Sequence, residues 1–479
     1  MPAATHIRVP SYRRREPDKE PLYQILAEHL ETFLQQARTS EHHLPFHVEK
    51  EMRAYLECGV LAYGFVRARC EECGKSRAVA FSCKKRGFCT SCTGRRMADT
   101  AARLVDDVLP RVPVRQFVLS FPYEIRYRLA WDGELVSAVL GVFLRVVGRW
   151  YRRQAQAAGF AKVRCGSVTF VQRFGSSLNV NPHVHVLMLD GVYIDGDEGP
   201  QFVPAPPLTD DDVQQIVQTS ARRIIRLCMK RGLLDSTQAD PLTDEEPVLA
   251  AITAASVRGL IATGERAGQR LRRVLRDPAR GIRTGPLCFA SRGFSLHAAT
   301  RIAADNRQGL EQLCRYVARP ALAAGRLRII DTDQLSFALK TPWSDGTTHL
   351  LLSPFELLEK LAALIPPPRL NLIRYHGILA PSARGRAKVV AGGGNEPKAQ
   401  SDSTHQPCPH RLSWCQLLAR VFSIDVTECP DCGGQMKIIA ALTDPASIRS
   451  YLEGVGLSAR PPPIAQARPA QQSEFEYAA

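Results

Sequence analysis

The chain has 479 residues, of which 45% are hydrophobic, so it contains enough apolar material for more than one buried core and is not wholly disordered. Its 63 lysines and arginines outnumber 47 acidic residues, and the net charge of +16 favours a polyanionic partner such as nucleic acid. No apolar run is long enough to span a membrane, and the first residues lack the apolar core of a signal peptide. We therefore expect a soluble, cytoplasmic protein with reduced cysteines and no membrane partner.

Hydrophobic periodicity predicts mixed helix and sheet along the chain. Residues 22–34 have the apolar spacing of an amphipathic helix, and a cysteine-rich stretch follows at 58–92. We then expect a strand at 116–120, a long helix at 134–156, and an antiparallel hairpin of residues 163–174 and 183–193. Later segments predict helices within 209–276, a strand at 294–297, a helix at 306–318 and sheet at 327–352.

A segment rich in Gly, Ser and Gln, residues 385–407, has the composition of a flexible linker and isolates a small C-terminal module. The pattern predicts four parts: an N-terminal helical and zinc-binding domain at 1–112, an α+β domain at 113–380, a linker at 381–407, and a cysteine module with a tail at 408–479. A phosphate-binding GxxxxGK[ST] loop is missing from the sequence, which excludes an ATP-driven motor of that type.

Paired cysteines predict a structural zinc site in the first domain. Cys70, Cys73, Cys89 and Cys92 form the pattern C-x2-C-x15-C-x2-C, which suits the four tetrahedral donors that Zn2+ requires. Cys83 lies within this pattern and Cys58 lies before it, so one of them could replace a ligand or support a second site. Basic residues surround the knuckles and form either a phosphate-facing surface or a solvated rim: Lys84, Lys85, Arg86, Arg95 and Arg96.

A second knuckle, Cys429-Pro-Asp-Cys432-Gly-Gly, lies in the C-terminal module. Only one pair is obvious, and the spacing of Cys408, His410 and Cys415, which could complete the site, fits no zinc template. The other cysteines stand alone in apolar surroundings and are predicted core residues: Cys165, Cys228, Cys288 and Cys314.

A His-Val-His sequence at residues 183–185 predicts a site for a divalent ion. Residues i and i+2 of a strand face the same side, so His183 and His185 project together. The alternative is a histidine pair that is simply on the surface or hydrogen-bonded and binds no metal. A third ligand has to come from a neighbouring element, and Gln172 on the preceding strand is the first candidate.

A tyrosine on a helix supplies a candidate nucleophile. Leu310, Leu313, Cys314 and Val317 form an apolar stripe, and Tyr316 falls on its flank. Arg315 and Arg319 add positive charge suited to a scissile phosphate. The rival is Tyr375, which also neighbours an arginine and a histidine, although Gly377 suggests a turn there.

These motifs together resemble one family. They are Phe81-Ser-Cys83-Lys-Lys-Arg-Gly-Phe-Cys89-x-x-Cys92-x-x-Arg95-Arg96-Met97, Asn181-Pro-His-Val-His185, Arg315-Tyr316-Val-Ala-Arg-Pro320 and Cys429-Pro-Asp-Cys432-Gly-Gly-x-Met436. In content and order they resemble the rolling-circle HUH transposases of insertion-sequence-ninety-one and common-region elements. The resemblance covers nearly the whole chain.

The resemblance implies an HUH nuclease domain with a central antiparallel sheet and flanking helices, between a zinc-binding module and a C-terminal cysteine knuckle. It implies Mg2+ or Mn2+ at His183 and His185, and attack by Tyr316 that joins it to the 5′ phosphate of single-stranded DNA at element ends and target. Unwinding then falls to another protein such as a host helicase. Two-tyrosine members carry a second tyrosine four residues on, where this chain has Pro320, so it resembles the single-tyrosine branch. Whether a second protomer in a homo-oligomer assists strand transfer is left open.

Three functions therefore compete. The first is a transposase that nicks and rejoins single-stranded DNA. The second is a plasmid-type rolling-circle replication initiator, against which the zinc module and the C-terminal knuckle argue. The third is a zinc-dependent DNA-binding regulator without catalysis.

Overall fold

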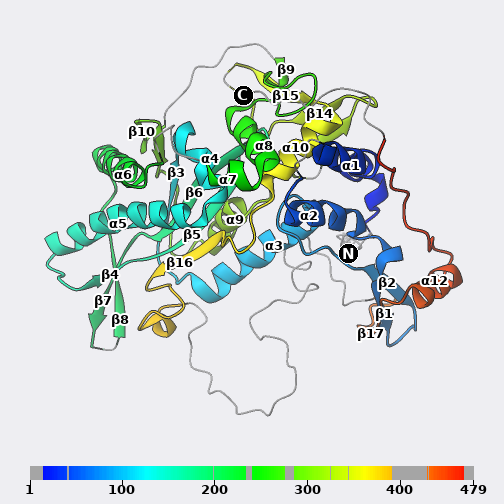
Figure 1. Cartoon of the computed structure of the whole chain (residues 1–479). Helices are drawn as coiled ribbons and strands as arrows, with labels where there is room; N and C mark the ends of the chain where they lie inside the picture. Colours follow the sequence, from blue (N-terminus) through cyan, green and yellow to red (C-terminus); the bar gives the residue numbers. More distant parts are fainter. Residues whose placement is uncertain are drawn as a thin grey trace, which may run out of the picture.

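The computed structural model describes residues 15–39, 43–197, 199–233, 240–275, 285–323, 325–343, 345–390, 429 and 431–468. Figure 1 shows a sheet flanked by the long helices α5 (Gly133–Ala157) and α6 (Asp210–Lys230), with the N-terminal helices α1 (Pro21–Thr39) and α2 (Phe46–Glu57) on the other side of the molecule. Among the described helices, none combines the length and the apolar character that crossing a membrane requires.

A central antiparallel sheet organises the middle of the chain. Its strands run in the order β10-β11-β3-β6-β5-β16, and β12 also pairs with β3. They are β3 (Val114–Ser120), β5 (Gly166–Phe174), β6 (Val180–Leu189), β10 (Cys288–Ser291), β11 (Phe294–His297), β12 (Arg301–Ile302) and β16 (Ile373–Gly377). The expected hairpin is confirmed, because β5 and β6 pair antiparallel with Gln172 opposite His183. The α+β class is confirmed with it.

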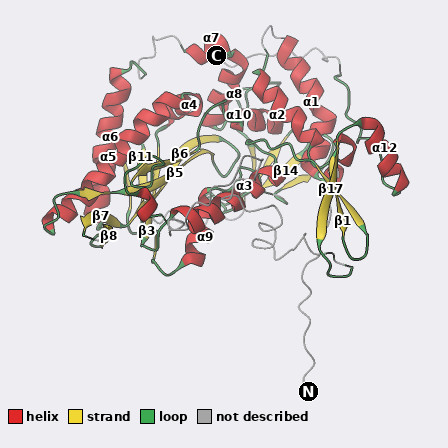
Figure 2. Cartoon of the chain, turned by 90° about the horizontal axis from the view of Figure 1, so that it is seen from below, coloured by secondary structure: helices red, strands yellow, loops and turns green. Residues whose placement is uncertain are grey.

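Helices bury both faces of this sheet (Figure 2). On one face α4 (Tyr123–Trp131), α5 and α6 pack over Val184 and Val186 of β6. On the other face lie α3 (Thr90–Arg103), the π-helical turn η3 (Leu104–Val108) and α9 (Arg307–Val317). Successive residues of β6 therefore meet different helical layers.

The N-terminal helices share a core with later segments of the chain. α1 and α2 pack with α8 (Pro247–Arg258), α10 (Pro354–Leu364) and a second sheet of order β13-β14-β15-β9. The expected boundary at residue 112 therefore does not separate two cores. The strands of this second sheet are β9 (Arg272–Leu275), β13 (Leu327–Ile329), β14 (Leu335–Ala338) and β15 (Thr347–Leu352).

Short elements complete the description. β4 (Val163–Arg164), β7 (Gly191–Gly196) and β8 (Gly199–Pro204) form a small separate sheet. The short helix α7 (Pro241–Glu245) precedes α8, and single 3-10 turns occur at η1 (Pro17–Lys19), η2 (Leu61–Tyr63) and η4 (Arg386–Lys388).

The linker-like segment before the C-terminal module predicts a separate unit. The structure instead pairs this module with the N-terminal part of the chain. Strand β17 (Met436–Leu442) pairs antiparallel with β1 (Phe65–Cys70), which also pairs with β2 (Ser76–Ala80). Helix α12 (Pro445–Gly454) lies beside this sheet (Figure 1), and its Ile448 and Leu452 pack with Leu61 and Phe65. The C-terminal segment thus completes an N-terminal sheet. Residues 391–428, including Cys408, His410 and Cys415, lie outside the described residues.

A buried carboxylate ties four elements around the central sheet together. Asp190, directly after β6, accepts hydrogen bonds from Arg115 of β3 at 3.1 and 3.2 Å, from Tyr151 of α5 at 2.8 Å and from Arg301 of β12 at 2.7 Å. Its carboxylate and the Arg115 guanidinium are both almost fully buried. Since a buried charge is tolerated only when it is paired, this network fixes the end of β6.

We expect Asp190→Ala to lower the free energy of unfolding by about 3–5 kcal/mol, because the substitution leaves the buried Arg115 guanidinium without its carboxylate. Urea denaturation of the purified protein measures this change. The matched control is Asp195→Ala, which removes an ion pair between Arg164 and the mostly exposed Asp195 and should cost less than about 1 kcal/mol. Equal effects of the two variants would contradict the role assigned to Asp190.

Candidate functional site

The two histidines of β6 lie together on the face of the sheet that α9 covers. Their ring centroids are 5.0 Å apart, whereas Val184 and Val186 enter the opposite core. Both histidines are buried, with His183 at 9% exposure and His185 at 2%. The alternation of a strand accounts for this division of side chains between the two faces.

Hydrogen bonds hold both rings by their Nδ1 atoms. His183 Nδ1 lies 2.7 Å from the carbonyl oxygen of Asn181, and His185 Nδ1 lies 2.8 Å from the side-chain amide of Gln116 on β3. His185 Nε2 is buried without a hydrogen-bond partner in the described part of the chain. The ring edges carrying Nε2 are therefore the ones left for a ligand.

Burial also keeps these imidazoles neutral. It lowers the pKa of His185 to about 3, helped by the neighbouring His183 and by Arg319. Burial likewise lowers the pKa of His183, and Arg319 and Arg126 add to the shift against the opposing Asn181 carbonyl. A neutral imidazole offers a nitrogen lone pair, which is the form that binds metal ions.

Gln172 joins the histidines on the same face. It lies opposite His183 on β5, and its Nε2 donates a hydrogen bond of 2.7 Å to the carbonyl of Val317, the last residue of α9. Its Oε1 is buried and has no partner among the described residues. Two imidazole nitrogens and one unpartnered amide oxygen form a donor set that could hold a divalent ion.

Tyr316 stands beside this donor set. The buried stripe of α9 is Leu310, Leu313, Cys314 and Val317, as the sequence predicted, and it leaves Tyr316 40% exposed on the flank. The tyrosine ring lies 5.9 Å from the His185 ring, at 87° to it. The nucleophile candidate and the metal-ligand candidates thus meet at one place, although they are far apart in the sequence.

Two cations flank the tyrosine ring. The Arg319 guanidinium lies 4.6 Å and the Lys340 ammonium 4.9 Å from its centroid. Arg315, in contrast, is engaged by Glu311 of its own helix at 2.5 Å. Arg319 is therefore the better placed of the two arginines expected to meet a phosphate.

The rival tyrosine occupies a different setting. Tyr375 lies within strand β16, opposite Val168 of β5, and not in the turn that Gly377 suggested. Burial raises the pKa of its hydroxyl, which makes it a weaker nucleophile than an exposed tyrosine.

A cavity of about 290 Å³ lies beside Gln172, between the residues after α9 and those around the start of α3. Gln172 and Arg319 line one side of it, and Arg86 and Arg96 line another. Arg86 also donates to the carbonyls of Leu370 and Pro367, whereas Lys84, Arg95 and Arg96 are exposed and Lys85 is half-buried. Part of the expected basic surface thus borders the site itself.

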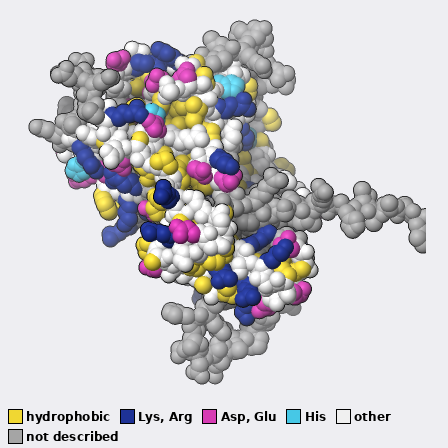
Figure 3. All heavy atoms as spheres, turned by 90° about the vertical axis from the view of Figure 1, so that its right-hand side faces the viewer, with side chains coloured by type: hydrophobic (Ala, Val, Ile, Leu, Met, Phe, Trp, Pro, Cys, Tyr) yellow, Lys and Arg dark blue, Asp and Glu magenta, His cyan; other side chains and the backbone are white. Residues whose placement is uncertain are grey.

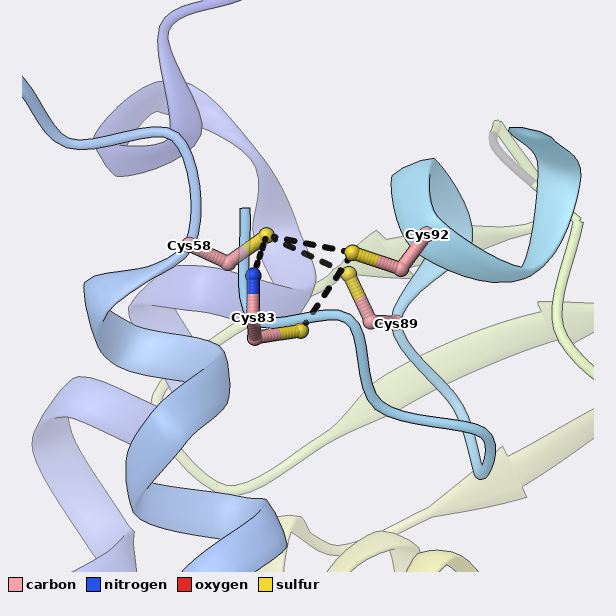
Figure 4. Close-up of side chains that lie close together, drawn as sticks. All are labelled: Cys58, Cys83, Cys89 and Cys92. Atoms are coloured by element: carbon pink, nitrogen blue, oxygen red, sulfur yellow. Dashed lines mark hydrogen bonds between the residues drawn. The ribbon is translucent and has the colours of Figure 1, made fainter. Parts of the chain in front are cut away.

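Among the described residues the cysteines form two clusters, and the expected set of Cys70, Cys73, Cys89 and Cys92 is not one of them. The Cys58 cluster contains Cys58, Cys83, Cys89 and Cys92 (Figure 4). Its measured sulfur–sulfur distances are 3.6 Å for Cys58 to Cys89, 3.7 Å for Cys58 to Cys92 and 3.4 Å for Cys83 to Cys92. The Cys70 cluster contains Cys70, Cys73, Cys429 and Cys432.

The elements explain this regrouping. Cys58 caps the end of α2, Cys89 begins α3 and Cys92 lies in its first turn, so helix packing brings them together. The turn at Cys70 and Cys73 lies instead at the far end of β1, away from α3. Hydrogen bonds from neighbouring thiols, that of Cys58 first, lower the pKa of Cys92 and favour its thiolate.

Three of the residues in these sites were not assigned from the sequence. Gln116 could have been found, because strand alternation places it on the face of His185. Cys58 had been considered only as an alternative ligand. Lys340 follows β14 in a loop of an otherwise separate sheet, and no sequence pattern links it to Tyr316.

Comparison with family models gives two matches. Residues 25–121 match the "Transposase zinc-binding domain" model of IS91-type elements, and residues 166–387 match the model described as "Putative transposase". The first match spans the whole Cys58 cluster, and the second spans His183, His185 and Tyr316. Curated proteins and solved structures gave no match.

We expect Cys58→Ser to reduce the zinc content by one ion per chain and to lower the temperature of thermal unfolding, because metal binding supplies folding energy to such a cluster. Elemental analysis and calorimetry of the purified protein measure both effects. Cys165→Ser, outside both clusters, is the control and should leave the zinc content unchanged. Full zinc content in Cys58→Ser would remove Cys58 from the ligand set.

Proposed function

The chain belongs to the IS91-type transposases, and on this premise we propose that it cleaves and rejoins single-stranded DNA through a 5′-phosphotyrosine at Tyr316, in rolling-circle transposition. The observation that carries the proposal is the position of the Tyr316 ring, 5.9 Å from the ring of His185. The two family matches favour a transposase over a plasmid-type initiator or a non-catalytic regulator.

His183, His185 and Gln172 are the residues that would hold Mg2+ or Mn2+. The buried, unpartnered Nε2 of His185 and Oε1 of Gln172 support this assignment, because such atoms are costly unless a ligand occupies them. A bound divalent ion would polarise the scissile phosphate and stabilise the charge that develops on it. Gln116 would orient the His185 ring through the contact of its side-chain amide with Nδ1.

The tyrosine carries out the covalent step. Its hydroxyl oxygen forms a bond to phosphorus, the bond from phosphorus to the 3′ oxygen breaks, and that oxygen takes up a proton. The tyrosine proton passes to solvent. In the reverse step a 3′ hydroxyl attacks the phosphotyrosine, so the energy of the phosphodiester bond is kept and no ATP is needed.

Gln172 couples the ligand set to the nucleophile. Its Oε1 is free for the ion, while its Nε2 holds the carbonyl of Val317, the residue after Tyr316. A single side chain thus fixes the distance between the metal ligands and the helix that carries the tyrosine. Such fixed positioning contributes to catalysis because the reacting groups lose little freedom on reaction.

The charge around the site suits a DNA strand. The cationic side chains of Arg319 and Lys340 lie beside the Tyr316 ring, and Arg86 and Arg96 line the adjoining cavity. Phosphate contacts by such side chains are independent of sequence and weaken with salt. Strand unwinding is assigned to another protein such as a host helicase.

The chain offers one tyrosine at this helix. α9 ends at Val317, and Pro320 stands beyond the helix where a two-tyrosine relative would carry its second hydroxyl. The same tyrosine would therefore serve cleavage and transfer, or a second protomer would supply another.

We expect His185→Ala to lower the rate of metal-dependent cleavage by at least about a thousand-fold, because losing a ligand removes several kcal/mol of phosphate polarisation. Gln116→Leu keeps the ligand and removes only its hydrogen bond, so it should weaken Mn2+ affinity by about 10–100-fold. Cleavage of labelled single-stranded oligonucleotides across a Mn2+ titration measures both effects. If the double variant His183→Ala/His185→Ala cleaved DNA at the wild-type rate, the metal site would lie elsewhere.

Tyr316→Phe removes one hydroxyl and keeps the ring, so fold and DNA affinity should persist while the covalent 5′ adduct disappears. A denaturing gel with a labelled oligonucleotide detects the adduct as a shifted protein band. Tyr375→Phe is the matched control and should form the adduct as the wild type does. An adduct that survives in Tyr316→Phe and is lost in Tyr375→Phe would transfer the nucleophile to β16.

A further inference from the structure

Two cysteine pairs, more than 350 residues apart in the chain, share a sequence pattern and the backbone geometry of their described residues. Cys70-Glu-Glu-Cys73-Gly74 and Cys429-Pro-Asp-Cys432-Gly433 both read C-x-x-C-G. Their glycines have nearly identical positive φ angles, +74° for Gly74 and +76° for Gly433. Residues with side chains rarely adopt this conformation, so glycine is required at both positions.

The backbone hydrogen bonds of the two turns also correspond. Cys70 N–H donates to the carbonyl of Lys75 at 2.8 Å, and Cys429 N–H donates to that of Gly434 at 2.7 Å. Gly74 N–H returns to the Cys70 carbonyl at 3.1 Å, and Gly433 N–H to the Cys429 carbonyl at 2.8 Å. Each turn is therefore a complete knuckle that aims two sulfurs in one direction.

The four sulfurs converge between the knuckles. Cys70 Sγ lies 3.5 Å from Cys432 Sγ, and Cys73 Sγ lies 3.6 Å from Cys429 Sγ. Four thiolates bound to Zn2+ at about 2.3 Å have tetrahedral edges of about 3.8 Å, whereas a disulfide brings sulfurs to about 2.05 Å. The distances match the edges of a zinc tetrahedron.

Close contacts around the sulfurs support a built site. A Cβ atom on Gly434 would lie only 3.0 Å from Cys70 Sγ, so the bare backbone of one knuckle packs on the sulfur of the other. Lys75 pairs with Asp431 at 3.3 Å, and Lys437 pairs with Glu71 at 3.4 Å. In one of these exposed ion pairs the lysine comes from the N-terminal segment, and in the other it comes from the C-terminal segment. The two segments therefore have complementary charges, although each exposed ion pair contributes little energy.

We propose that Cys70, Cys73, Cys429 and Cys432 bind one zinc ion that joins the two ends of the chain. All four coordination positions are filled by protein, so the ion is structural and not catalytic. Together with the sheet β2-β1-β17, it makes a single zinc ribbon from an N-terminal and a C-terminal segment. The ribbon lies on the side of the molecule that faces the viewer in Figure 3, and on this side lysines and arginines stand among acidic and hydrophobic side chains.

This inference does not depend on the proposed function, and zinc counting tests it. Full-length protein should contain two zinc ions, one for each cluster, by elemental mass spectrometry. Cys70→Ser/Cys73→Ser, Cys429→Ser/Cys432→Ser and the variant with all four changes should each contain one, because both pairs hold the same ion. Cys288→Ser, outside both clusters, is the control and should keep two. Two ions retained in Cys429→Ser/Cys432→Ser, or one ion in the wild type, would overturn the proposal.

Cysteine alkylation distinguishes loss of this zinc site from unfolding of the protein. In Cys429→Ser/Cys432→Ser, Cys70 and Cys73 should become reactive while Cys83, Cys89 and Cys92 stay protected. Cys73→His keeps a zinc ligand at an exposed position and should retain the second ion that Cys73→Ser loses. Protection of Cys70 and Cys73 after removal of both C-terminal cysteines would contradict a shared ion.

Discussion

The pairing of β6 between β3 and β5 is the constraint on which the rest of the structure depends. With β6 in this register, alternate residues face opposite sides of the sheet. Val184 and Val186 pack in the core under α5, while His183 and His185 face α9. A one-residue slip would exchange the two sets and destroy both the core and the site. Asp190 fixes the end of the strand through Arg115, Arg301 and Tyr151, and so holds this register.

Helix α3 connects the Cys58 cluster with helix α9. Cys89 is the N-cap residue of α3 and Cys92 lies in its first turn, and Ala101 near its other end packs in the same core as Leu310 and Leu313 of α9. The Cys58 cluster therefore positions a helix that packs against α9, the helix that carries Tyr316.

Local patterns made much of this architecture predictable. The alternation in β6, the stripe of α9 and the hairpin were read correctly because each depends on neighbours in the sequence. The observed cysteine clusters differ from the expected zinc ligands because sequence spacing identifies a pair of cysteines but not the second pair that joins it. The second pair beside Cys70 and Cys73 lies beyond residue 428. The shared core of α1, α2, α8 and α10, and Lys340 beside Tyr316, depend on tertiary packing that periodicity does not encode.

The most direct test of the account is to identify the residue that carries DNA after cleavage. The wild-type protein is incubated with Mn2+ and a single-stranded oligonucleotide from an element end, then digested with nuclease and trypsin for mass spectrometry. The account predicts one nucleotide-modified peptide that begins at Tyr316 and carries the modification on that residue. A nucleotide on any other residue, or cleavage without a covalent peptide, would contradict the assignment of Tyr316 as the nucleophile.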